Sequence, residues 1–314
     1  MRDALVDDTT DTLEEAGFAV SDRCNIRPKS FDVVARRGPL VLLVKVLDNI
    51  DGLTAETAEE MKVLSEHLEA PSVLVGRKSS DRQLEDGVLY LRYGVPAMNL
   101  VSLREFLVEG VPPFVYMARG GLYVNIDGEV LEEHRRAEEL SLGQVANELG
   151  VSRRSVSKYE SGMDATLDVA MELEDLFEEP LIAPVDPFDR IDDPEEGPEE
   201  RVPDGREEPF RDLVTAGFEV MLTQRAPFRA VSEEHEADEP DTVLTGTSRS
   251  GGDLEKRARL MSSIAEVVGT RSVYLVEDQP RRQTIEETVL LGLDELRDVD
   301  GADDFDEVYR DKLT

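Results

Sequence analysis

Cysteine and histidine are scarce in this sequence of 314 residues, and tryptophan is absent. The single cysteine, Cys24, excludes an internal disulfide framework and a cysteine-based zinc site. The three histidines, His67, His134 and His235, are far apart in the sequence and form no metal-ligand pattern. We therefore expect neither a bound metal nor a cofactor.

Long apolar runs and phosphate-binding loops are also missing. No secretory signal occurs and no apolar run reaches about 18 residues, so we expect a soluble, cytoplasmic protein without a membrane partner. Neither GxxxxGK[ST] nor GxGxxG occurs, and the segment Ser248 to Gly252 is too short for such a loop. No Ser-His-Asp set can be proposed, so we expect no catalytic residues and no enzyme.

Positive charge is scarce. The 70 acidic and 35 basic residues give a net charge of -35, and only seven of the basic residues are lysine. This acid-rich, lysine-poor composition resembles cytoplasmic proteins of halophiles that accumulate salt, where molar salt shortens the Debye length to about 3 Å and screens self-repulsion. The alternative is an acidic protein from a low-salt organism. In either case, non-specific affinity for nucleic acid is expected to be weak.

Residues 141–162 predict a helix-turn-helix. Ser141 and Gln144 have the spacing of a capping box at the start of a first helix. Gly150 ends that helix because glycine adopts a left-handed conformation without strain. Ser152 then caps a second helix. The apolar residues expected to face inward are Leu142, Val145, Ala146, Leu149, Val156 and Tyr159.

The outer face of the second helix is basic and polar, which suits insertion into a DNA major groove. We predict that Arg153 and Arg154 contact base edges, with arginine preferring guanine. Ser155 and Ser157 are expected to contact bases or phosphates. The predicted phosphate contacts are Gln144, Ser152 and Lys158. A plain two-helix hairpin is the alternative, but a positive cluster in so acidic a chain favours a DNA reader.

This stretch resembles the Cro/C1-type DNA-binding family. The matching residues are Ser141, Val145-Ala146, the run Leu149 to Ser152, Val156-Ser157 and the run Tyr159 to Gly162. The family often has glutamine directly after the first cap, where it touches phosphate, but this sequence has Leu142 there and Gln144 is the available substitute. A helix is expected before the motif, over residues 129–139, in which Arg135 and Arg136 lie near phosphate or are simply solvated. A helix over residues 164–178 is expected to close the bundle.

The chain before residue 118 alternates helix and strand patterns, which predicts a small α/β domain. The run Leu40 to Leu47 is apolar on both faces apart from Lys45, as is typical of a central strand. The other predicted strands cover residues 18–20, 31–35, 72–76 and 88–90, and the predicted helices cover residues 3–16, 54–68 and 100–109. The Pro and Gly content of residues 110–121 indicates the domain boundary.

This order of elements resembles the restriction-endonuclease-like, PD-(D/E)xK nucleases. The resemblance implies an Asp at the second strand and a Glu-x-Lys on the third, of which the two carboxylates hold Mg²⁺ and the Lys adds positive charge at the same point. Asp32 and Lys45 occupy the first and last positions, but Leu43 stands where the family has Glu, and leucine cannot bind a hard cation. We therefore interpret Asp32 and Lys45 as vestigial nuclease positions that form an ion pair. A carboxylate displaced to Glu56 or Glu59 would be needed for activity.

The sequence predicts four segments. They are a degenerate nuclease-like α/β domain over 1–118, a Cro/C1-type helix-turn-helix domain over 119–183, an acidic Pro-rich linker over 184–209 and a second α/β domain over 210–314. The second α/β domain weakly repeats the first: the run Leu13 to Val20 parallels Leu213 to Val220, and Phe31 to Ala35 parallels Phe228 to Ser232. Either this is an internal duplication, so that one chain mimics a nuclease-like dimer, or the similarity is chance.

The layout resembles an archaeal group of helix-turn-helix transcriptional regulators. We therefore expect a sequence-specific, DNA-binding transcriptional regulator from a halophile. Its expected partner is double-stranded DNA, bound as a homodimer because one short recognition helix reads only a few base pairs. Two alternatives remain open. The first is a metal-dependent nuclease with a displaced carboxylate, and the second is a protein-interaction adaptor with a vestigial helix-turn-helix.

Overall fold

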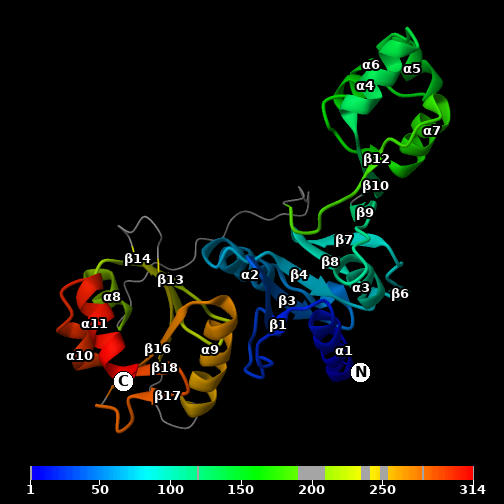
Figure 1. Ribbon diagram of the computed structural model, residues 1–314. Coiled ribbons are helices and arrows are strands. Elements are labelled where there is room, and N and C mark those ends of the chain that lie inside the picture. The colour runs from blue at the N-terminus through cyan, green and yellow to red at the C-terminus, as the bar shows by residue number, and fades with distance from the viewer. Residues whose placement is uncertain are drawn as a thin grey trace. The chain divides into compact units, whose positions relative to one another are not determined.

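The computed structural model describes residues 2–118, 120–189, 209–234, 241–247, 254–277 and 279–313. The chain divides into two compact units (Figure 1). The first contains Met1–Val46, Leu53–Ser72 and Gly197–Thr314, and the second contains Leu47–Gly52 and Val73–Glu196. Most of the predicted linker over 184–209, like the loop Ser248 to Gly252 and His235, lies outside the described residues.

The N-terminal half of the first unit begins with a helix and continues into an antiparallel meander. Its elements are α1 (Arg2–Glu15), β1 (Ala19–Val20), β2 (Val33–Arg37), β3 (Leu40–Val46) and α2 (Ala55–His67). Gly17 turns the chain from α1 into β1 with a φ of 82°, a conformation that favours glycine. Strand β3 is buried almost along its whole length, as its continuous apolar run predicts. Strand β2 begins two residues later than predicted.

The C-terminal half of the first unit is a mixed sheet with helices. Its first part contains α8 (Phe210–Thr215), β13 (Phe218–Leu222), β14 (Ala230–Glu234), β15 (Thr242–Thr247) and α9 (Leu254–Val268). Its second part contains β16 (Arg271–Val276), β17 (Thr284–Ile285), β18 (Thr288–Gly292), α10 (Leu293–Arg297) and α11 (Ala302–Leu313). The strand order is β13-β14-β15-β16-β18-β17, in which β16 is parallel to both β15 and β18 and the other pairs are antiparallel.

Two of the apolar cores in the first unit involve its C-terminal half. One lies between α8, α10, α11 and one face of the C-terminal sheet, where Phe305 packs edge-on against Phe218. The other core is built from both halves of the unit, since Phe31 and Leu64 lie in the same buried cluster as Phe228 and Ile264.

The second unit contains the remainder of the α/β region. Its elements are η1 (Ile50–Gly52), β4 (Ser72–Val75), β5 (Lys78–Ser79), β6 (Arg82–Gln83), β7 (Val88–Arg92), β8 (Val95–Met98), α3 (Leu100–Leu107), β9 (Val115–Ala118) and β10 (Gly121–Ile126). Asn99 caps α3, because its side chain accepts a hydrogen bond from the Ser102 amide at 2.8 Å. Strand β4 pairs with β8 in parallel, and β8 pairs with β7 in antiparallel orientation.

The segment predicted as a boundary, residues 110–121, contains a sheet strand instead. Strand β9 pairs in parallel with β7 and in antiparallel orientation with β10, so the sheet continues through this segment. The Pro and Gly residues lie at the two ends of the segment, whereas its middle, Val115 to Met117, consists of residues that favour strands. The composition of the whole segment therefore concealed a strand.

The rest of the second unit is a small helical bundle attached to β10. It contains α4 (Gly128–Ala137), α5 (Leu142–Glu148), α6 (Arg153–Tyr159), β11 (Ala165–Thr166), α7 (Leu167–Phe177) and β12 (Ile182–Ala183). Strands β11 and β12 both pair with β10. The buried cluster of the bundle includes Val145, Val156, Tyr159 and Leu173. The four helices agree with the predicted ones to within a few residues, but β11 and β12 were not predicted.

The helices that the structure describes are too short or too polar to cross a membrane.

Candidate nucleic-acid interface

Helices α5 and α6 form the predicted helix-turn-helix. The Ser141 hydroxyl accepts a hydrogen bond from the Gln144 amide, and the Gln144 side chain accepts one from the Ser141 amide at 2.9 Å, which confirms the capping box. Gly150 has a φ of 61° in the turn, and the Val151 amide donates to the Ala146 carbonyl at 3.0 Å. The local sequence therefore fixes both the start of α5 and the turn after it.

Helix α6 turns its apolar side inward and its basic side to solvent. Val156 and Tyr159 are buried, whereas Arg153, Arg154 and Lys158 are exposed. These three cations form no hydrogen bond or ion pair with the residues that the structure describes. Ser157 is also exposed on this side. The arrangement leaves the charged groups of α6 available to an external ligand.

The remaining predicted contact residues lie at helix starts. Ser152 caps α6, since its hydroxyl accepts a hydrogen bond from the Ser155 amide at 3.0 Å and lies 2.9 Å from the Ser155 hydroxyl. The side-chain oxygen of Gln144 is used within the capping box, so the side-chain nitrogen is the group left to donate. The structure thus places all seven predicted residues on α5, α6 or the start of α6.

An ion pair that the sequence did not predict holds the end of α6. Nε and Nη2 of Arg135 both donate to the Glu160 carboxylate, with Nη2 at 3.2 Å from Oε2, and Nη1 donates to the Leu140 carbonyl at 2.9 Å. Both side chains are nearly buried, exposed to 12% and 10%. The hydrogen bond to Glu160 raises the pKa of Arg135. Arg135 is therefore a buried structural residue, which corrects its prediction as a phosphate-proximal or solvated charge.

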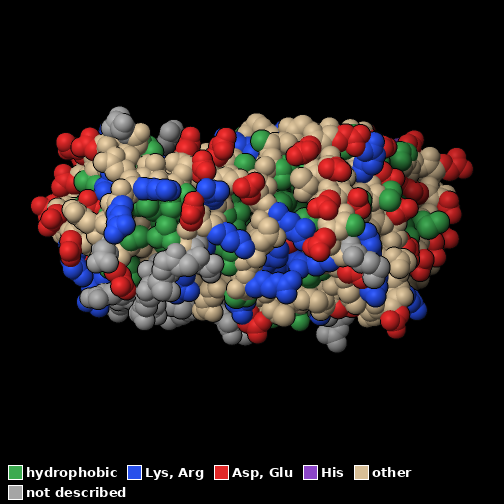
Figure 2. All heavy atoms as spheres, turned by 90° about the horizontal axis from the view of Figure 1, so that it is seen from below, with side chains coloured by type: hydrophobic (Ala, Val, Ile, Leu, Met, Phe, Trp, Pro, Cys, Tyr) green, Lys and Arg blue, Asp and Glu red, His purple; other side chains and the backbone are tan. Residues whose placement is uncertain are grey.

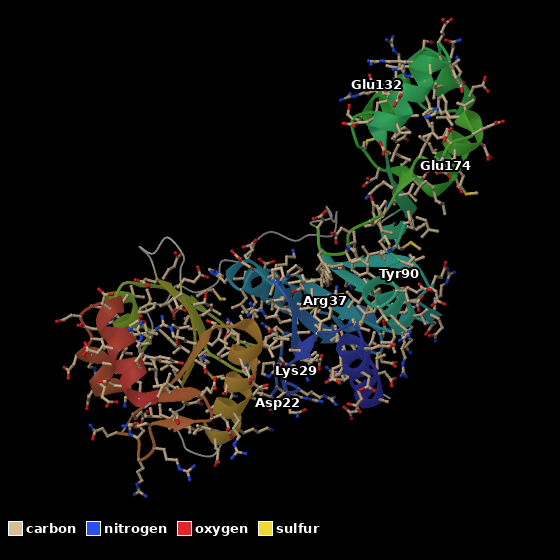
Figure 3. The ribbon with its side chains drawn as sticks, in the orientation of Figure 1. Asp22, Lys29, Arg37, Tyr90, Glu132 and Glu174 are labelled. Carbon is tan, nitrogen blue, oxygen red and sulfur yellow. The ribbon has the colours of Figure 1, made fainter. Side chains whose placement is uncertain are left out.

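Close packing of backbone holds the same end of α6. A Cβ on Gly128, the first residue of α4, would lie 2.5 Å from the Glu160 carbonyl oxygen and 2.7 Å from that of Tyr159. Only glycine fits there without moving the backbone. Arg136 differs from its neighbour, since it is exposed and pairs with Glu132 on the surface of α4 (Figure 3). Helix α4 thus positions α6 through Gly128 and Arg135.

Side chains also tie the bundle to the strands beneath it. Glu174 on α7 accepts hydrogen bonds from the Leu181 and Ile182 amides at 2.8 and 3.0 Å (Figure 3). The Tyr116 hydroxyl of β9 donates to Asp164 at 2.6 Å, before β11. Burial, together with this bond, raises the pKa of Tyr116. Strand β9 and the bundle are therefore joined by a buried polar contact as well as by the sheet.

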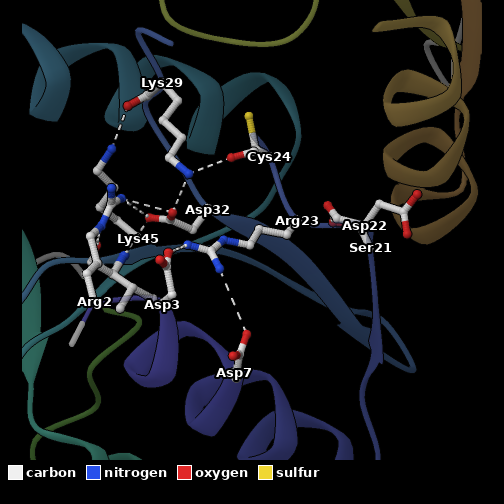
Figure 4. Close-up of polar contacts among 11 residues, drawn as sticks. Arg2, Asp3, Asp7, Ser21, Asp22, Arg23, Cys24, Lys29, Asp32 and Lys45 are labelled. Atoms are coloured by element: carbon white, nitrogen blue, oxygen red, sulfur yellow. Dashed lines mark hydrogen bonds and ion pairs between the residues drawn. The ribbon is translucent and has the colours of Figure 1, made fainter. Parts of the chain in front are cut away.

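Asp32 and Lys45, which the sequence predicts to be vestigial nuclease positions, lie in a separate cluster in the first unit (Figure 4). Asp32 is fully buried, and its carboxylate accepts hydrogen bonds from Arg2 at 3.0 and 3.1 Å and from the Val46 amide at 2.9 Å. The Lys29 ammonium lies 2.6 Å from the same carboxylate. The ammonium of Lys45, on β3, donates to the Lys29 carbonyl. The predicted ion pair between Asp32 and Lys45 is therefore not formed, because the cations that bind the Asp32 carboxylate are Arg2 and Lys29, which sequence reasoning missed.

Burial has a measurable consequence for Lys45. Desolvation lowers the pKa of its ammonium from 10.5 to about 8, and the positive charges of Arg2 and Lys29 act in the same direction, against the opposing effect of Asp32. The cluster has three cations for one carboxylate. Cys24 lies beside it, and burial raises the pKa of the Cys24 thiol.

The residues of this cluster do not fit a catalytic metal. Leu43, at the position of the second ligand, is fully buried in the apolar core. Both oxygens of Asp32 already accept hydrogen bonds from protein donors. Glu59 lies 3.8 Å from Lys62, and Glu56 is hydrogen-bonded at the start of α2. In the described segments, no three His, Cys, Asp or Glu residues converge as a metal site would require.

The C-terminal half has no acidic residue at the position whose backbone bonding matches that of Asp32. The Asp32 amide donates to the Val44 carbonyl at 2.7 Å, and the Arg229 amide donates to the Thr245 carbonyl at the same distance. Arg229 thus occupies the place of Asp32. Gly246 follows Thr245 on β15, and a Cβ at Gly246 would lie 2.5 Å from the ring of Tyr274. A fully buried aromatic ring therefore fills the space beside the strand in this half.

Acidic side chains dominate the surface. Figure 2 shows Asp and Glu over much of one face, with Lys and Arg gathered in part of it. With a net charge of -35, any binding of DNA depends on local groups rather than on an overall positive field.

Comparisons with known proteins identify both regions. Residues 2–113 match the PD-(D/E)XK superfamily domain, and residues 131–182 match the Helix-turn-helix family. No solved structure matches the chain.

Full-length relatives occur in archaea, and each is named as a putative HTH-type transcriptional regulatory protein. The protein of Halorubrum lacusprofundi is 48% identical, over 99% of this chain and 97% of its own length. The protein of Halobacterium salinarum is 49% identical over 99% and 98%, and that of Methanococcoides burtonii is 44% identical over 99% and 97%. The chain therefore belongs to this family of helix-turn-helix proteins from halophilic and methanogenic archaea.

Proposed function

We propose that the protein is a sequence-specific, DNA-binding transcriptional regulator that reads double-stranded DNA with α6. The observation that carries the proposal is the exposed side of α6, on which Arg153, Arg154 and Lys158 form no bond with other described residues. A capped helix with a basic outer face, held at a fixed angle by a second helix, is the arrangement that reads a major groove.

The residues of the reader take different roles. Arg153 and Arg154, at the start of α6, contact base edges, where arginine pairs with guanine through two hydrogen bonds. Ser157 and Ser155 contact bases or phosphates. Lys158, Ser152 and the amide nitrogen of Gln144 hold phosphates and so set the register of the helix on DNA. Arg135 and Gly128 position α6 without touching DNA.

The names of the relatives support the regulatory part of the proposal, since each names a transcriptional regulator of the helix-turn-helix type. We infer action on the chromosome in the cytoplasm. The binding form is a homodimer, because α6 has seven residues and reads only a few base pairs.

We also infer that the chain consists of a nuclease-like α/β domain over 1–118, the reader over 119–183, a linker over 184–209 and a second nuclease-like domain over 210–314. The order of elements supports a duplication. Each α/β domain begins with a helix, three antiparallel strands and a long helix. Two parallel strands follow, β4 and β8 in the first domain and β16 and β18 in the second. The second strand of each pair also has an antiparallel neighbour, β7 or β17. Gly17-Phe18 and Gly217-Phe218 follow the first helix in each.

We propose that neither α/β domain is an enzyme. The protein donors around Asp32, the buried Leu43 and the replacement of Asp32 by Arg229 in the other half support this. The direct check is Mg²⁺-dependent cleavage of plasmid DNA. Cleavage that is lost in Asp32→Ala but kept in Asp7→Ala, an exposed residue of α1, would restore the nuclease function.

The experiment that tests the regulator is the selection of binding sites from random DNA in about 2 M KCl, where self-repulsion is screened. The wild type is run beside Arg153→Ala/Arg154→Ala. The matched control is Arg259→Ala/Arg310→Ala, which removes two arginines that are 57% and 76% exposed in the C-terminal half. We expect one enriched motif for the wild type and the control, and none for the α6 variant.

Two outcomes contradict the proposal. Enrichment that persists in the α6 variant would place the reader elsewhere. No enrichment for any of the three proteins would leave the adaptor, in which the helix-turn-helix is vestigial, as the better account.

A further inference from the structure

The two halves of the first unit pack on each other with the same face. Main-chain hydrogen bonds establish which positions correspond. Asp32 and Arg229 make the same bond to the neighbouring strand, so Phe31 corresponds to Phe228. At the ends of α2 and α9, the Ala70 amide donates to Ser65 and the Thr270 amide to Ala265, each at 2.9 Å. The correspondence therefore rests on backbone geometry and not on sequence similarity.

Corresponding apolar residues meet in the core between the halves. The rings of Phe31 and Phe228 lie 6.4 Å apart, so a position touches its own counterpart. The same buried cluster takes further residues in corresponding pairs from the two halves: Val34 with Val231, Leu43 with Leu244, and Leu64 with Ile264. Contact between a position and its own counterpart is what a two-fold interface between identical subunits produces on its axis.

Polar contacts away from this axis are reciprocal. Arg36, the fourth residue of β2, donates to the Val268 carbonyl at the end of α9, at 2.9 Å. Glu233, the fourth residue of β14, lies 2.7 Å from Nδ1 of His67 at the end of α2. The end of β2 thus contacts the end of α9, and the end of β14 contacts the end of α2. A two-fold axis relates such contacts, whereas a chance packing of two domains does not.

We propose that the C-terminal half is the built-in dimer partner of the N-terminal half, so that the face of the N-terminal half that carries Phe31 and Arg36 is covered within one chain and not by a second copy. The proposal rests on the duplication inferred above and is independent of DNA binding. One chain then carries two α/β domains but a single helix-turn-helix. A second reader joins only through a surface outside this interface.

The contacts suit unlike halves better than like halves. Arg36 places a cation at the carboxyl end of α9, where the helix dipole favours it, while Glu233 pairs with His67. Two C-terminal halves would instead bring the Glu233 carboxylate against the Val268 carbonyl. Two acceptors without a donor repel each other, so this pairing is disfavoured.

Glu60 adds a second distinction between the halves. Its carboxylate accepts hydrogen bonds from the Gln224 and Arg225 amides at 2.9 and 2.7 Å, and its counterpart on α9 is the buried apolar Leu260. The loop that it binds, residues 224–227, is shorter than the corresponding loop over residues 25–30. Two N-terminal halves would therefore lack the amides that Glu60 needs. Each half is complementary to the other and not to itself.

Cysteine cross-linking in the full chain tests the proposal. His67→Cys/Glu233→Cys is made in a Cys24→Ala background and oxidised in about 2 M KCl at low protein concentration. Both positions are about one quarter exposed, so the substitutions fall outside the apolar core. The control is His67→Cys/Glu234→Cys, because successive residues of a strand point to opposite faces. We expect a cross-linked product of monomer mass for the first pair, in at least several-fold higher yield than for the control.

The other outcomes overturn the proposal. A cross-linked product of dimer mass would show that the halves pair between two chains. A yield no higher than that of the control would show that the halves do not pair in solution. Site selection from random DNA in the same cross-linked protein separates this result from the proposed function, since the cross-link is made within the first unit and α6 belongs to the second.

A second measurement keeps the proposal open to refutation if the cysteine variants fold poorly. A protease site is placed between residues 200 and 205, the full chain is cut, and the fragments are separated by size. We expect the two fragments to elute together at the mass of one chain, and to separate more readily in Glu60→Ala than in Glu59→Ala. Fragments that separate at once in the wild type would contradict the proposal.

Discussion

Two clusters of cations in this acidic chain differ in what surrounds them. On α6, Arg153, Arg154 and Lys158 face solvent and bind nothing else in the described structure. Around Asp32, the cations Arg2 and Lys29 are hydrogen-bonded to a buried carboxylate. The difference shows that the number of arginines and lysines does not locate a DNA interface. A cation serves an external phosphate or base only when no group of the protein already holds it.

The largest expected effect breaks the buried cluster. Asp32→Ala leaves Arg2 and Lys29 without their carboxylate, and losing one partner of a buried ion pair costs about 3 to 5 kcal/mol. Denaturant unfolding in about 2 M KCl measures this loss. Asp7→Ala, whose side chain is 72% exposed, is the control and should change stability little. Equal stability of the two variants would show that Asp32 is not a buried partner.

The second-largest expected effect is the pH dependence of stability that buried Lys45 causes. The pKa of Lys45 is about 8 in the folded protein and 10.5 ordinarily, so the unfolded chain holds this proton more tightly. Charged Lys45 therefore opposes folding fully below pH 8, and this cost is relieved as the pH rises from about 8 to 10.5. Lys45→Met lacks the effect. The free energy of unfolding of the wild type relative to Lys45→Met should rise by about 2 to 3 kcal/mol between about pH 7 and about pH 10.

If the difference in the free energy of unfolding between the wild type and Lys45→Met does not change across this pH range, the burial of a charged Lys45 is contradicted. Lys78→Met, which removes a lysine that is 36% exposed, is the matched control and should give a smaller slope.

A smaller effect concerns the support of α6. Arg135→Ala leaves Glu160 without its partner and should destabilise the bundle by about 2 kcal/mol while weakening DNA binding. Arg136→Ala, which breaks an exposed pair with Glu132, should change stability by less than about 1 kcal/mol. Thermal unfolding and site binding of both variants make the comparison. If Arg135→Met/Glu160→Leu restores DNA binding, the pair positions α6 and does not itself contact DNA.

The smallest effect separates phosphate from base contacts on α6. Lys158→Ala should weaken binding to all sequences alike and reduce the slope of log K against log salt concentration by about 1. Arg153→Ala should relax the sequence preference instead, at a cost of about 1 to 3 kcal/mol for the preferred site. Affinity measured at several KCl concentrations, on the selected site and on a scrambled one, distinguishes the two. A loss confined to the selected site in Lys158→Ala would assign that residue to base readout.

Sequence reasoning succeeded where neighbouring residues decide the structure. The capping residues Ser141 and Ser152, the turn at Gly150 and the apolar run of β3 act over a few positions, so their patterns predicted α5, α6 and a buried strand correctly.

It failed where partners are far apart in the chain. Arg2 and Lys29 reach Asp32 only through folding, and Arg135 lies 25 residues from Glu160. No periodic pattern encodes such pairs, although Glu160 stood within the recognised motif. Short strands such as β9 and β11 were missed for a related reason: their pairing with β10 decides their conformation, and two to four residues carry too little local preference.

Strand β9 has a mechanical consequence for the reader. It is hydrogen-bonded to β7 on one side and to β10 on the other, and the bundle follows β10 without a free tether. Rotation of the bundle about this connection requires breaking main-chain hydrogen bonds, so the paired strands β9 and β10 form a stiff connection. In the proposed complex with DNA, a force on α6 would therefore be transmitted through β10 to the sheet.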